Sequence, residues 1–239
     1  VSLFTGFLIG MGSGVNVCVA HRLGAGSEKG AAVTIHSSFV ICTVTGLVLG
    51  AAGIAFAQPL LSLLHTKEEL IGGAVLYLKI YSLGMPAMAI YNFGNGVLSA
   101  CGETKRPLLY LTVAGVLNVI LNLFFVIVCR MAADGVAIAS VISQYLSAVL
   151  IVRHLLCRRD ACRLHLSRGY LDRRACENVL SLGIPSGLQN AIFAIANLFV
   201  QTGVNSFDAV LVSGNSAAAN ADTIICHGMA AFHTGCASF

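Results

Sequence analysis

Residues Ser181 to Phe207 read SLGIPSGLQNAIFAIANLFVQTGVNSF, an apolar run long enough to cross a bilayer as a helix. Amide side chains interrupt the run at Gln189, Asn197, Gln201 and Asn205. These positions are eight, four and four residues apart, which keeps the amides on one slowly drifting face of a helix. Because an unpaired amide is costly in hydrocarbon, this face must meet other helices or a water-filled cavity.

The composition of the whole chain is that of a membrane protein. Of its 239 residues, 57% are apolar and 10% are charged, whereas roughly 25% are charged in soluble domains. The formal net charge is +4, but the basic residues stand beside apolar runs, where they act as topology signals and not as a nucleic-acid surface. We therefore expect a multi-pass protein of the plasma (inner) membrane, surrounded by lipid. Because the first residue is Val1 and the apolar sequence continues to Phe239, we also expect a fragment of a longer chain.

Most of the apolar segments reach the about 20 residues that a spanning helix needs. There are seven of them, approximately Val1 to Ala20, Val33 to Ala57, Gly72 to Ala100, Leu108 to Cys129, Gly135 to Cys157, Gly183 to Ser206, and Val210 to the end. None shows the alternation of a transmembrane β-barrel. The predicted fold is an all-α polytopic helical bundle.

The connections between these segments differ in their content of basic residues. The first, third and fifth connections hold Arg22, Lys29, Lys105, Arg106, Arg153, Arg158, Arg159, Arg163, Arg168, Arg173 and Arg174. The second, fourth and sixth hold Lys67 and Arg130. Since basic loops stay in the cytoplasm, the odd-numbered connections are predicted to be cytoplasmic.

The stretch 158–182 is basic where its neighbours are apolar, which indicates a cytoplasmic linker between two membrane units, 1–157 and 183–239. Residues Leu171 to Leu182 keep roughly helical apolar spacing, which predicts a short amphipathic helix at the interface, with Asp172 as its N-cap. A plain solvated loop is the alternative.

The motif SLGxP occurs at Ser82–Pro86 and again at Ser181–Pro185. An inverted structural repeat or coincidence would account for the two copies equally well. In both places we expect the proline in the first turn of a helix, where its missing N–H does no harm.

Motifs for enzymatic chemistry are absent from the sequence. The nine cysteines are scattered without metal-ligand spacing, which predicts neither a metal site nor a disulfide. There is no phosphate-binding loop, no HExxH or GxSxG motif and no paired carboxylates, so we expect no enzyme, no ATP-driven pump and no bound cofactor.

Polar side chains inside the spans are the candidates for function. Asn118 and Asn122 lie one turn apart in the fourth span, and the fifth span places serines and an amide at the same spacing: Ser140, Ser143, Gln144 and Ser147. Singly, such groups commonly join helices by hydrogen bonds. Together with Asn92 of the third span and the amides of the sixth, they predict a hydrated interior cavity. Asp222 is either a titratable carboxylate inside the seventh span or lies near an interface.

Several of these stretches closely resemble the multidrug and toxic compound extrusion (MATE) family, within the larger superfamily of drug, oligosaccharidyl-lipid and polysaccharide flippases. They are GVNVCVAHRLGAGSEKGAA (14–32), YLKIYSLGMPAMAIYNFGNGVLSACGETKRPLL (77–109), GVLNVILNLFFVI (115–127), DGVAIASVISQ (134–144) and SLGIPSGLQNAIFAIANL (181–198). The resemblance covers nearly the whole chain.

The resemblance implies a two-lobed transporter of twelve helices around a central cavity, of which this chain would supply helices two to eight. Residues 1–157 would form most of the first lobe and 183–239 the start of the second. In many members a cation site of the first lobe uses an NxxxD motif and a threonine of the next helix. Asn118 matches the asparagine, Asn122 stands in place of the aspartate and Ser140 in place of the threonine.

The function implied by this resemblance is antiport: entry of Na⁺ or H⁺ drives export of amphipathic or cationic drugs and toxic compounds. Asn118, Asn122 and Ser140 are the expected cation-binding residues. The side chains expected to line the substrate cavity are Asn92, Gln144, Gln189, Asn197, Gln201 and Asp222. A lipid-linked oligosaccharide flippase of the same superfamily, or a non-transporting helical receptor or channel subunit, are the alternatives.

Overall fold

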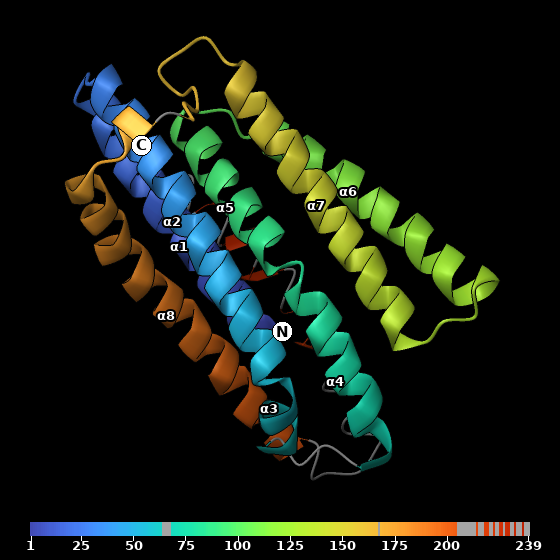
Figure 1. Ribbon diagram of the computed structural model, residues 1–239. Helices are drawn as coiled ribbons and strands as arrows, with labels where there is room; N and C mark the ends of the chain where they lie inside the picture. Colours follow the sequence, from blue (N-terminus) through green and yellow to red (C-terminus); the bar gives the residue numbers. More distant parts are fainter. Residues whose placement is uncertain are drawn as a thin grey trace.

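The computed structural model describes residues 1–63, 68–166 and 168–204, together with residues 214, 218, 219, 222, 225, 226, 228, 229, 232 and 236. The regular elements of this part of the chain are all helices (Figure 1). They are α1 (Ser2–Gly24), α2 (Glu28–Ala55), α3 (Ala57–Leu63), α4 (Glu68–Ser82), α5 (Met85–Ala100), α6 (Lys105–Leu123), the π-helical turn η1 (Phe124–Val128), α7 (Ala133–Cys157), the 3₁₀ turn η2 (Arg168–Tyr170) and α8 (Arg173–Val204). The predicted all-α membrane fold is confirmed.

Six spans of the described part of the chain fall where the sequence predicts them. Five helices are long and apolar enough to cross a membrane: α1, α2, α6 with η1, α7 and α8. The sixth span is broken, because α4 and α5 meet at an angle of 45°. The predicted seventh segment, from Val210 onward, lies almost wholly outside the described residues.

The break between α4 and α5 follows from the local sequence. Leu83 and Gly84 separate the two helices, and Pro86 sits in the first turn of α5, as predicted. A proline there needs no hydrogen-bond donor. The third predicted span is therefore two helices that turn at the first SLGxP motif.

The second SLGxP motif behaves differently, and the prediction for it is wrong. Pro185 lies in the interior of α8, which continues from Arg173 to Val204 without a separate amphipathic helix. The helix nevertheless begins as predicted, because Asp172 Oδ2 accepts a hydrogen bond of 3.0 Å from the backbone N–H of Ala175. The strong helical pattern on both sides outweighs the one backbone donor that proline removes, a compromise that membrane helices often make.

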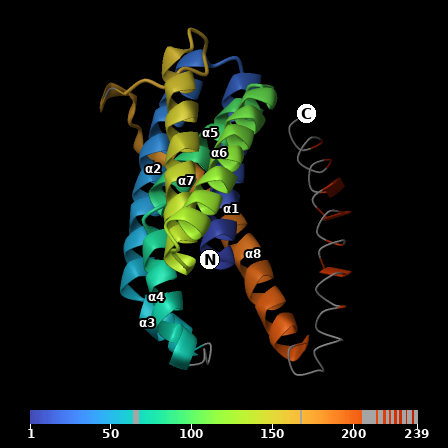
Figure 2. The same cartoon turned by 90° about the vertical axis from the view of Figure 1, so that its right-hand side faces the viewer.

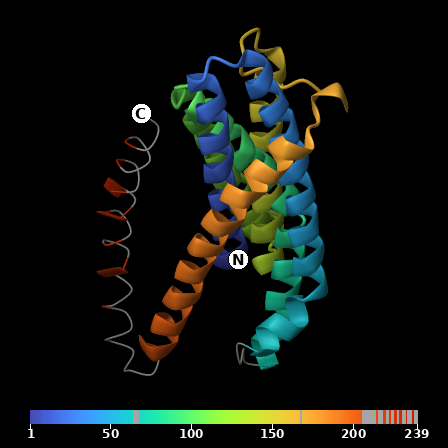
Figure 3. The ribbon, with the colours of Figure 1, turned by 90° about the vertical axis from the view of Figure 1, so that its left-hand side faces the viewer.

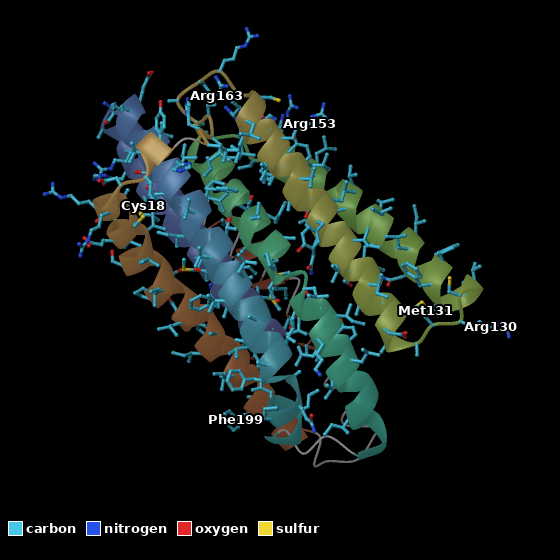
Figure 4. The ribbon with its side chains drawn as sticks, viewed as in Figure 1. Cys18, Arg130, Met131, Arg153, Arg163 and Phe199 are labelled. Atoms are coloured by element: carbon cyan, nitrogen blue, oxygen red, sulfur yellow. A yellow bond between two sulfur atoms is a disulfide. The ribbon has the colours of Figure 1, made fainter. Side chains whose placement is uncertain are left out.

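The basic connections gather at one end of the bundle. The α1–α2 turn, the α5–α6 turn and the α7–α8 linker lie side by side at the top of Figure 1. Arg153 and Arg163 mark this end in Figure 4, and Arg130 lies at the opposite end. We name the basic end the cytoplasmic end, after the predicted orientation.

The outer faces of α6, of η1 that continues it, and of α8 suit contact with lipid. Ile127 and Phe199 are 68% and 71% exposed, and Phe199 projects outward from α8 in Figure 4. The core lies between the helices instead, where Val15, Phe93 and Ile151 are completely buried. Apolar side chains on the outside of a bundle are what a hydrocarbon environment requires.

Helix α8 packs against α1 and away from α6 and α7 (Figures 2 and 3). The contact depends on glycines: a methyl group at Gly10 would lie 2.5 Å from Cα of Gly187, and one at Gly14 would lie 2.6 Å from Cα of Gly183. Small residues let two membrane helices approach at backbone distance, where van der Waals contact is largest. The first helix of the predicted second unit is thus closely packed on the first unit.

A disulfide joins Cys101, which caps the C-terminus of α5, to Cys162 in the α7–α8 linker. The prediction of no disulfide is therefore wrong. The two residues are 61 positions apart, and no spacing rule connects them. Folding of the linker back over the cytoplasmic end is what brings them together.

Candidate functional site

A polar cluster inside the membrane part of the bundle joins α6 to α7. The Asn118 amide on α6 donates to Ser143 Oγ on α7 at 3.2 Å and approaches Ser140 Oγ at 3.5 Å. One turn further along α6, Asn122 Nδ2 donates to Asn118 Oδ1 at 3.0 Å. We call these four side chains the α6–α7 cluster.

The hydroxyl protons of the cluster are used within α7. Ser140 Oγ donates to the carbonyl of Val136 and Ser143 Oγ donates to the carbonyl of Ser140, both at 2.9 Å. The two hydroxyl oxygens are therefore left as acceptors facing the Asn118 amide.

One acceptor of the cluster receives no hydrogen bond from the other members. Asn122 Oδ1 is buried and has no hydrogen-bond partner among the described residues. A buried acceptor without a partner costs about 1 to 3 kcal/mol, so this oxygen is the place in the cluster where a bound cation or water would gain most. Amide and hydroxyl oxygens are also the hard ligands that Na⁺ prefers.

The three predicted cation-site residues, Asn118, Asn122 and Ser140, are therefore brought together by α6 and α7. Ser143 completes the cluster and was not among the predicted cation-binding residues. Its position three residues after Ser140 was the available signal, because that spacing places both hydroxyls on one face of a helix.

Gln144 lies beside this cluster but faces the break between α4 and α5. Its Oε1 is buried without a hydrogen-bond partner among the described residues, and it fills the space that a side chain at Gly84 would occupy. The next residue, Tyr145, donates its hydroxyl to the carbonyl of Leu83 at 3.0 Å. Helix α7 thus touches the bend through two consecutive polar side chains.

The remaining predicted cavity residues are not gathered at the α6–α7 cluster. Asn92 is half-buried on α5 and donates to the carbonyl of Met88 in its own helix at 2.9 Å. Gln189 and Asn197 lie on exposed faces of α8. Asp222 is exposed, with the thiol of Cys226 at 3.8 Å, and the side chain of Gln201 lies outside the described residues.

A cavity of about 660 Å³ lies at the end opposite the cytoplasmic end. The starts of α1 and α7 contribute to its lining together with α3, α4 and α8: Val1, Ser2, Leu3, Phe4, Leu60, Leu61, Gly73, Ala74, Tyr77, Leu78, Ala133, Ala194 and Ile195. Nearly all of these side chains are apolar, so the space suits an amphipathic or apolar molecule.

A smaller cavity, about 400 Å³, lies between α1, α2 and α8 near the cytoplasmic end. Its lining is mixed: Val17, Cys18, His21, Arg22, Thr34, Asn178, Ser181 and Leu182. Cys18 marks its position in Figure 4, where α1 passes α8. Gln189 and Asn197, the predicted amides of α8 whose side chains the structure describes, are not among the lining residues of either cavity.

A cluster of charged groups at the cytoplasmic end holds the α5–α6 turn against the end of α7. Glu103 forms ion pairs with Arg158 and with Arg106, and Arg158 also binds Asp160 through two nitrogens. His154 Nε2 lies 3.5 Å from Glu103 Oε2. Such a network fixes the start of the linker in place.

The same contacts perturb the titration of the acids. Partial burial would raise the pKa of Glu103, but hydrogen bonds and charge from Arg158 and His154 together hold that pKa below its ordinary value. The hydrogen bond from Arg158 likewise lowers the pKa of Asp160. Both carboxylates are therefore ionised at neutral pH.

Within the part that the structure describes, no three His, Cys, Asp or Glu side chains lie close enough to share a metal ion. The α6–α7 cluster is uncharged and none of its groups titrates near neutral pH. Its oxygen and amide groups are suited to reversible binding of a small cation or a hydrogen-bonding molecule.

Comparison with known proteins gives the family. The MatE family profile matches residues 1–124. The chain is 31% identical over 223 residues to the probable multidrug resistance protein YpnP of Bacillus subtilis. This match covers 92% of this chain and 49% of YpnP. It is 24% identical over 232 residues to the FAD transporter of Shewanella oneidensis, which covers 93% of this chain and 50% of that protein.

The fold agrees with the sequence match. A solved structure of a MOP superfamily transporter from Pyrococcus furiosus superposes with a TM-score of 0.84 at 22% identity, over 93% of this chain and 50% of that chain. The chain thus spans about half the length of the relatives that it matches. These relatives are transporters and not enzymes, as the absence of catalytic motifs predicts. Since the family profile matches 124 of its 239 residues, the chain belongs to the MATE (MatE) family of multi-pass membrane transporters.

Proposed function

We propose that the whole protein is a cation-coupled antiporter of the plasma membrane that exports amphipathic or cationic drugs and toxic compounds. The observation that carries the coupling part of this proposal is the α6–α7 cluster, with its spare acceptor on Asn122. Polar groups inside a span destabilise a helix that only crosses the membrane. A cluster of oxygen ligands there therefore indicates a binding role.

The chemistry of the cluster favours Na⁺ over H⁺ as the ion bound there. Two amides and two hydroxyls supply oxygen ligands, but none can take up or release a proton in the physiological range. Rotation of the Asn118 amide would turn its Oδ1 toward the serine hydroxyls and add a further ligand. Coupling to H⁺ would require a carboxylate elsewhere in the whole protein.

The proposal of a drug-like cargo is supported by the larger cavity. Among the lining residues that the structure describes there is no Lys, Arg, Asp or Glu side chain. A lipid-linked oligosaccharide carries anionic phosphate groups, which cationic side chains would bind. The names of the relatives supply two classes of cargo to compare, multidrug substrates and FAD.

The test is flux through the whole protein in liposomes. A fluorescent cationic dye is loaded, and its export is followed under an imposed Na⁺ gradient, under a pH gradient and without a gradient. We expect Na⁺-driven export, reduced at least about tenfold by Asn118→Ala combined with Ser140→Ala, a loss of roughly 1.4 kcal/mol or more in ion binding. Thr112→Ala is the matched control, because this exposed side chain of α6 bonds only to its own helix.

Unchanged Na⁺ dependence in the double variant would exclude the α6–α7 cluster as the coupling site. Absence of dye flux in every gradient would contradict drug antiport and favour a receptor or channel subunit. Gradient-driven release of FAD in place of the dye would keep transport but replace the cargo.

A further inference from the structure

The cysteine pair at the cytoplasmic end joins two segments whose distance matters for a transporter. Cys101 ends α5 at the GETKRP turn, and Cys162 lies in the linker that leads to α8. Their Cα atoms are 6.8 Å apart, within the range that a disulfide spans. The bridge therefore ties the first unit to the path of the chain toward the second.

The location of this bridge makes it conditional. Both cysteines are flanked by the basic connections that define the cytoplasmic end, including Lys105, Arg106, Arg158 and Arg163. Cytosolic thiols are kept reduced by glutathione and thioredoxin, and disulfides found there are usually transient, catalytic or redox-sensing. A bridge on this side exists only when an oxidant has formed it.

Other contacts hold the two segments together when the bridge is open. Glu103, two residues after Cys101, forms an ion pair with Arg158. The backbone N–H of Leu164, two residues after Cys162, donates to the carbonyl of Leu155 at 3.1 Å. Cys162 is itself 5% exposed. The reduced thiols stay neighbours at a high effective concentration, so that oxidation of one is readily followed by closure.

We propose that Cys101 and Cys162 form a reversible dithiol–disulfide pair that peroxide oxidises and cytosolic dithiols reduce. Cys101 is the more accessible of the two, so its thiolate attacks the peroxide: an S–O bond forms, the O–O bond breaks and hydroxide leaves. The Cys162 thiolate then displaces hydroxide from the sulfenic acid, which makes the S–S bond. In sum, two thiols and one hydrogen peroxide give a disulfide and two waters, and two electrons pass from sulfur to peroxide.

The consequence concerns the movement of α8. At its far end the linker is already fixed to α2, because Ser37 Oγ accepts a 3.2 Å hydrogen bond from the N–H of Asp172 and approaches the carbonyl of Tyr170 at 3.5 Å. The near end is held by the Glu103–Arg158 ion pair, which can open, and the disulfide adds a covalent tie there. With both ends tied, the start of α8 loses freedom to move relative to α5, and oxidation slows any transport cycle that needs this movement. This last step rests on the proposed function, whereas the redox chemistry does not.

The first experiment counts thiols in the whole protein. Inside-out membrane vesicles expose the cytoplasmic face. One sample is treated with hydrogen peroxide, and a second is treated with hydrogen peroxide and then with dithiothreitol. Free thiols in both samples are alkylated with a maleimide reagent and identified by mass spectrometry. We expect a Cys101–Cys162 disulfide peptide after peroxide and two additional alkylated thiols after reduction. Cys157→Ser is the matched control, because Cys157 is a free, exposed cysteine at the same end of α7, and it should leave the pair unaffected.

A pair that stays reduced in peroxide, or a bridge that resists dithiothreitol in the folded protein, would overturn the proposal.

The second experiment measures dye export in the same vesicles. Oxidation should slow export by at least about twofold and reduction should restore it. Cys101→Ser and Cys162→Ser should both remove the response. If thiol counting shows the reversible pair but export is insensitive to it, the effect on movement is wrong; if no export occurs at all, the proposed function fails and the redox pair stands.

Discussion

Asn122 donates its side-chain amide to Oδ1 of Asn118 at 3.0 Å, and this single bond decides which oxygens of the α6–α7 cluster remain free. It occupies the Asn118 oxygen and leaves Asn122 Oδ1 buried without a partner. The family resemblance implies an aspartate in many members at the position of Asn122. The neutral amide can make this bond without any ion, whereas a carboxylate cannot.

Asn122→Asp should therefore make the stability of the protein depend on cations. Two acceptor oxygens would face each other, which removes a hydrogen bond and costs about 1 to 2 kcal/mol until Na⁺ or a proton comes between them. The measurement is the thermal midpoint of the purified whole protein with and without Na⁺, from pH 6 to pH 9. Asn122→Ala is the control, since it removes the donor without adding charge and should be equally destabilised but indifferent to ions. Equal midpoints for Asn122→Asp in all conditions would contradict this account.

Gly10→Ala should weaken the packing of α8 on α1. The added methyl group would meet the backbone of Ser186 and Gly187 at 2.5 Å, and backbone atoms cannot rotate away, so we expect a loss of about 1 to 3 kcal/mol. Gly115→Ala of α6 is the control, because nothing lies within 4 Å of its new methyl group; alanine there should stabilise by about 0.5 to 1 kcal/mol. Thermal unfolding in detergent compares the two, and a neutral Gly10→Ala would show that the helices are not in backbone contact.

Glu103→Gln should lower the thermal midpoint at neutral pH but have no effect in acid. Because the contacts of Glu103 hold its pKa below the ordinary value of 4.5, its ionised form stabilises the folded protein. That stabilisation is complete above about pH 4.5 and is lost as the pH falls through the lowered pKa of the folded state. The midpoint difference between the wild type and Glu103→Gln is measured from pH 7 downward. Glu177→Gln removes an ion pair in which both side chains are mainly exposed, and it should change little at any pH.

Ser37→Ala should loosen the start of α8. The Ser37 side chain is completely buried, and its loss leaves the N–H of Asp172 without its acceptor, at a cost of about 1 to 3 kcal/mol. Hydrogen exchange should rise in residues 170–176 before it rises elsewhere. Ser13→Ala is the comparison, because the exposed Ser13 hydroxyl bonds only within α1. Uniform exchange in both variants would mean that Ser37 does not anchor the linker.

The α6–α7 cluster was predictable to a large extent. Asn118 and Asn122 share a helical face because they are four residues apart, and Ser140 was assigned from the family resemblance. Long apolar runs likewise predicted the described spans, since a helix is the simplest way to satisfy backbone hydrogen bonds in lipid. The helix starts at Pro86 and Asp172 were predicted from the residues themselves, a proline in a first turn and an N-cap carboxylate.

Contacts between distant segments were not predictable. Cys101 and Cys162 meet because the linker folds back, and Gly10 and Gly187 meet because two helices cross at one particular depth. The continuity of α8 through Pro185 also depends on its surroundings, since neighbouring helices can compensate for the missing donor.

The sequence by itself thus determined the membrane class, the described spans, the predicted orientation and the family, because periodicity, charge and motif spacing are local along the chain. Only the tertiary structure decided which polar oxygens lack a hydrogen-bond partner, which glycines lie in helix contacts and which cysteines form a disulfide. These are properties of groups brought within a few ångströms of each other by packing, and the order of residues does not encode such distances directly.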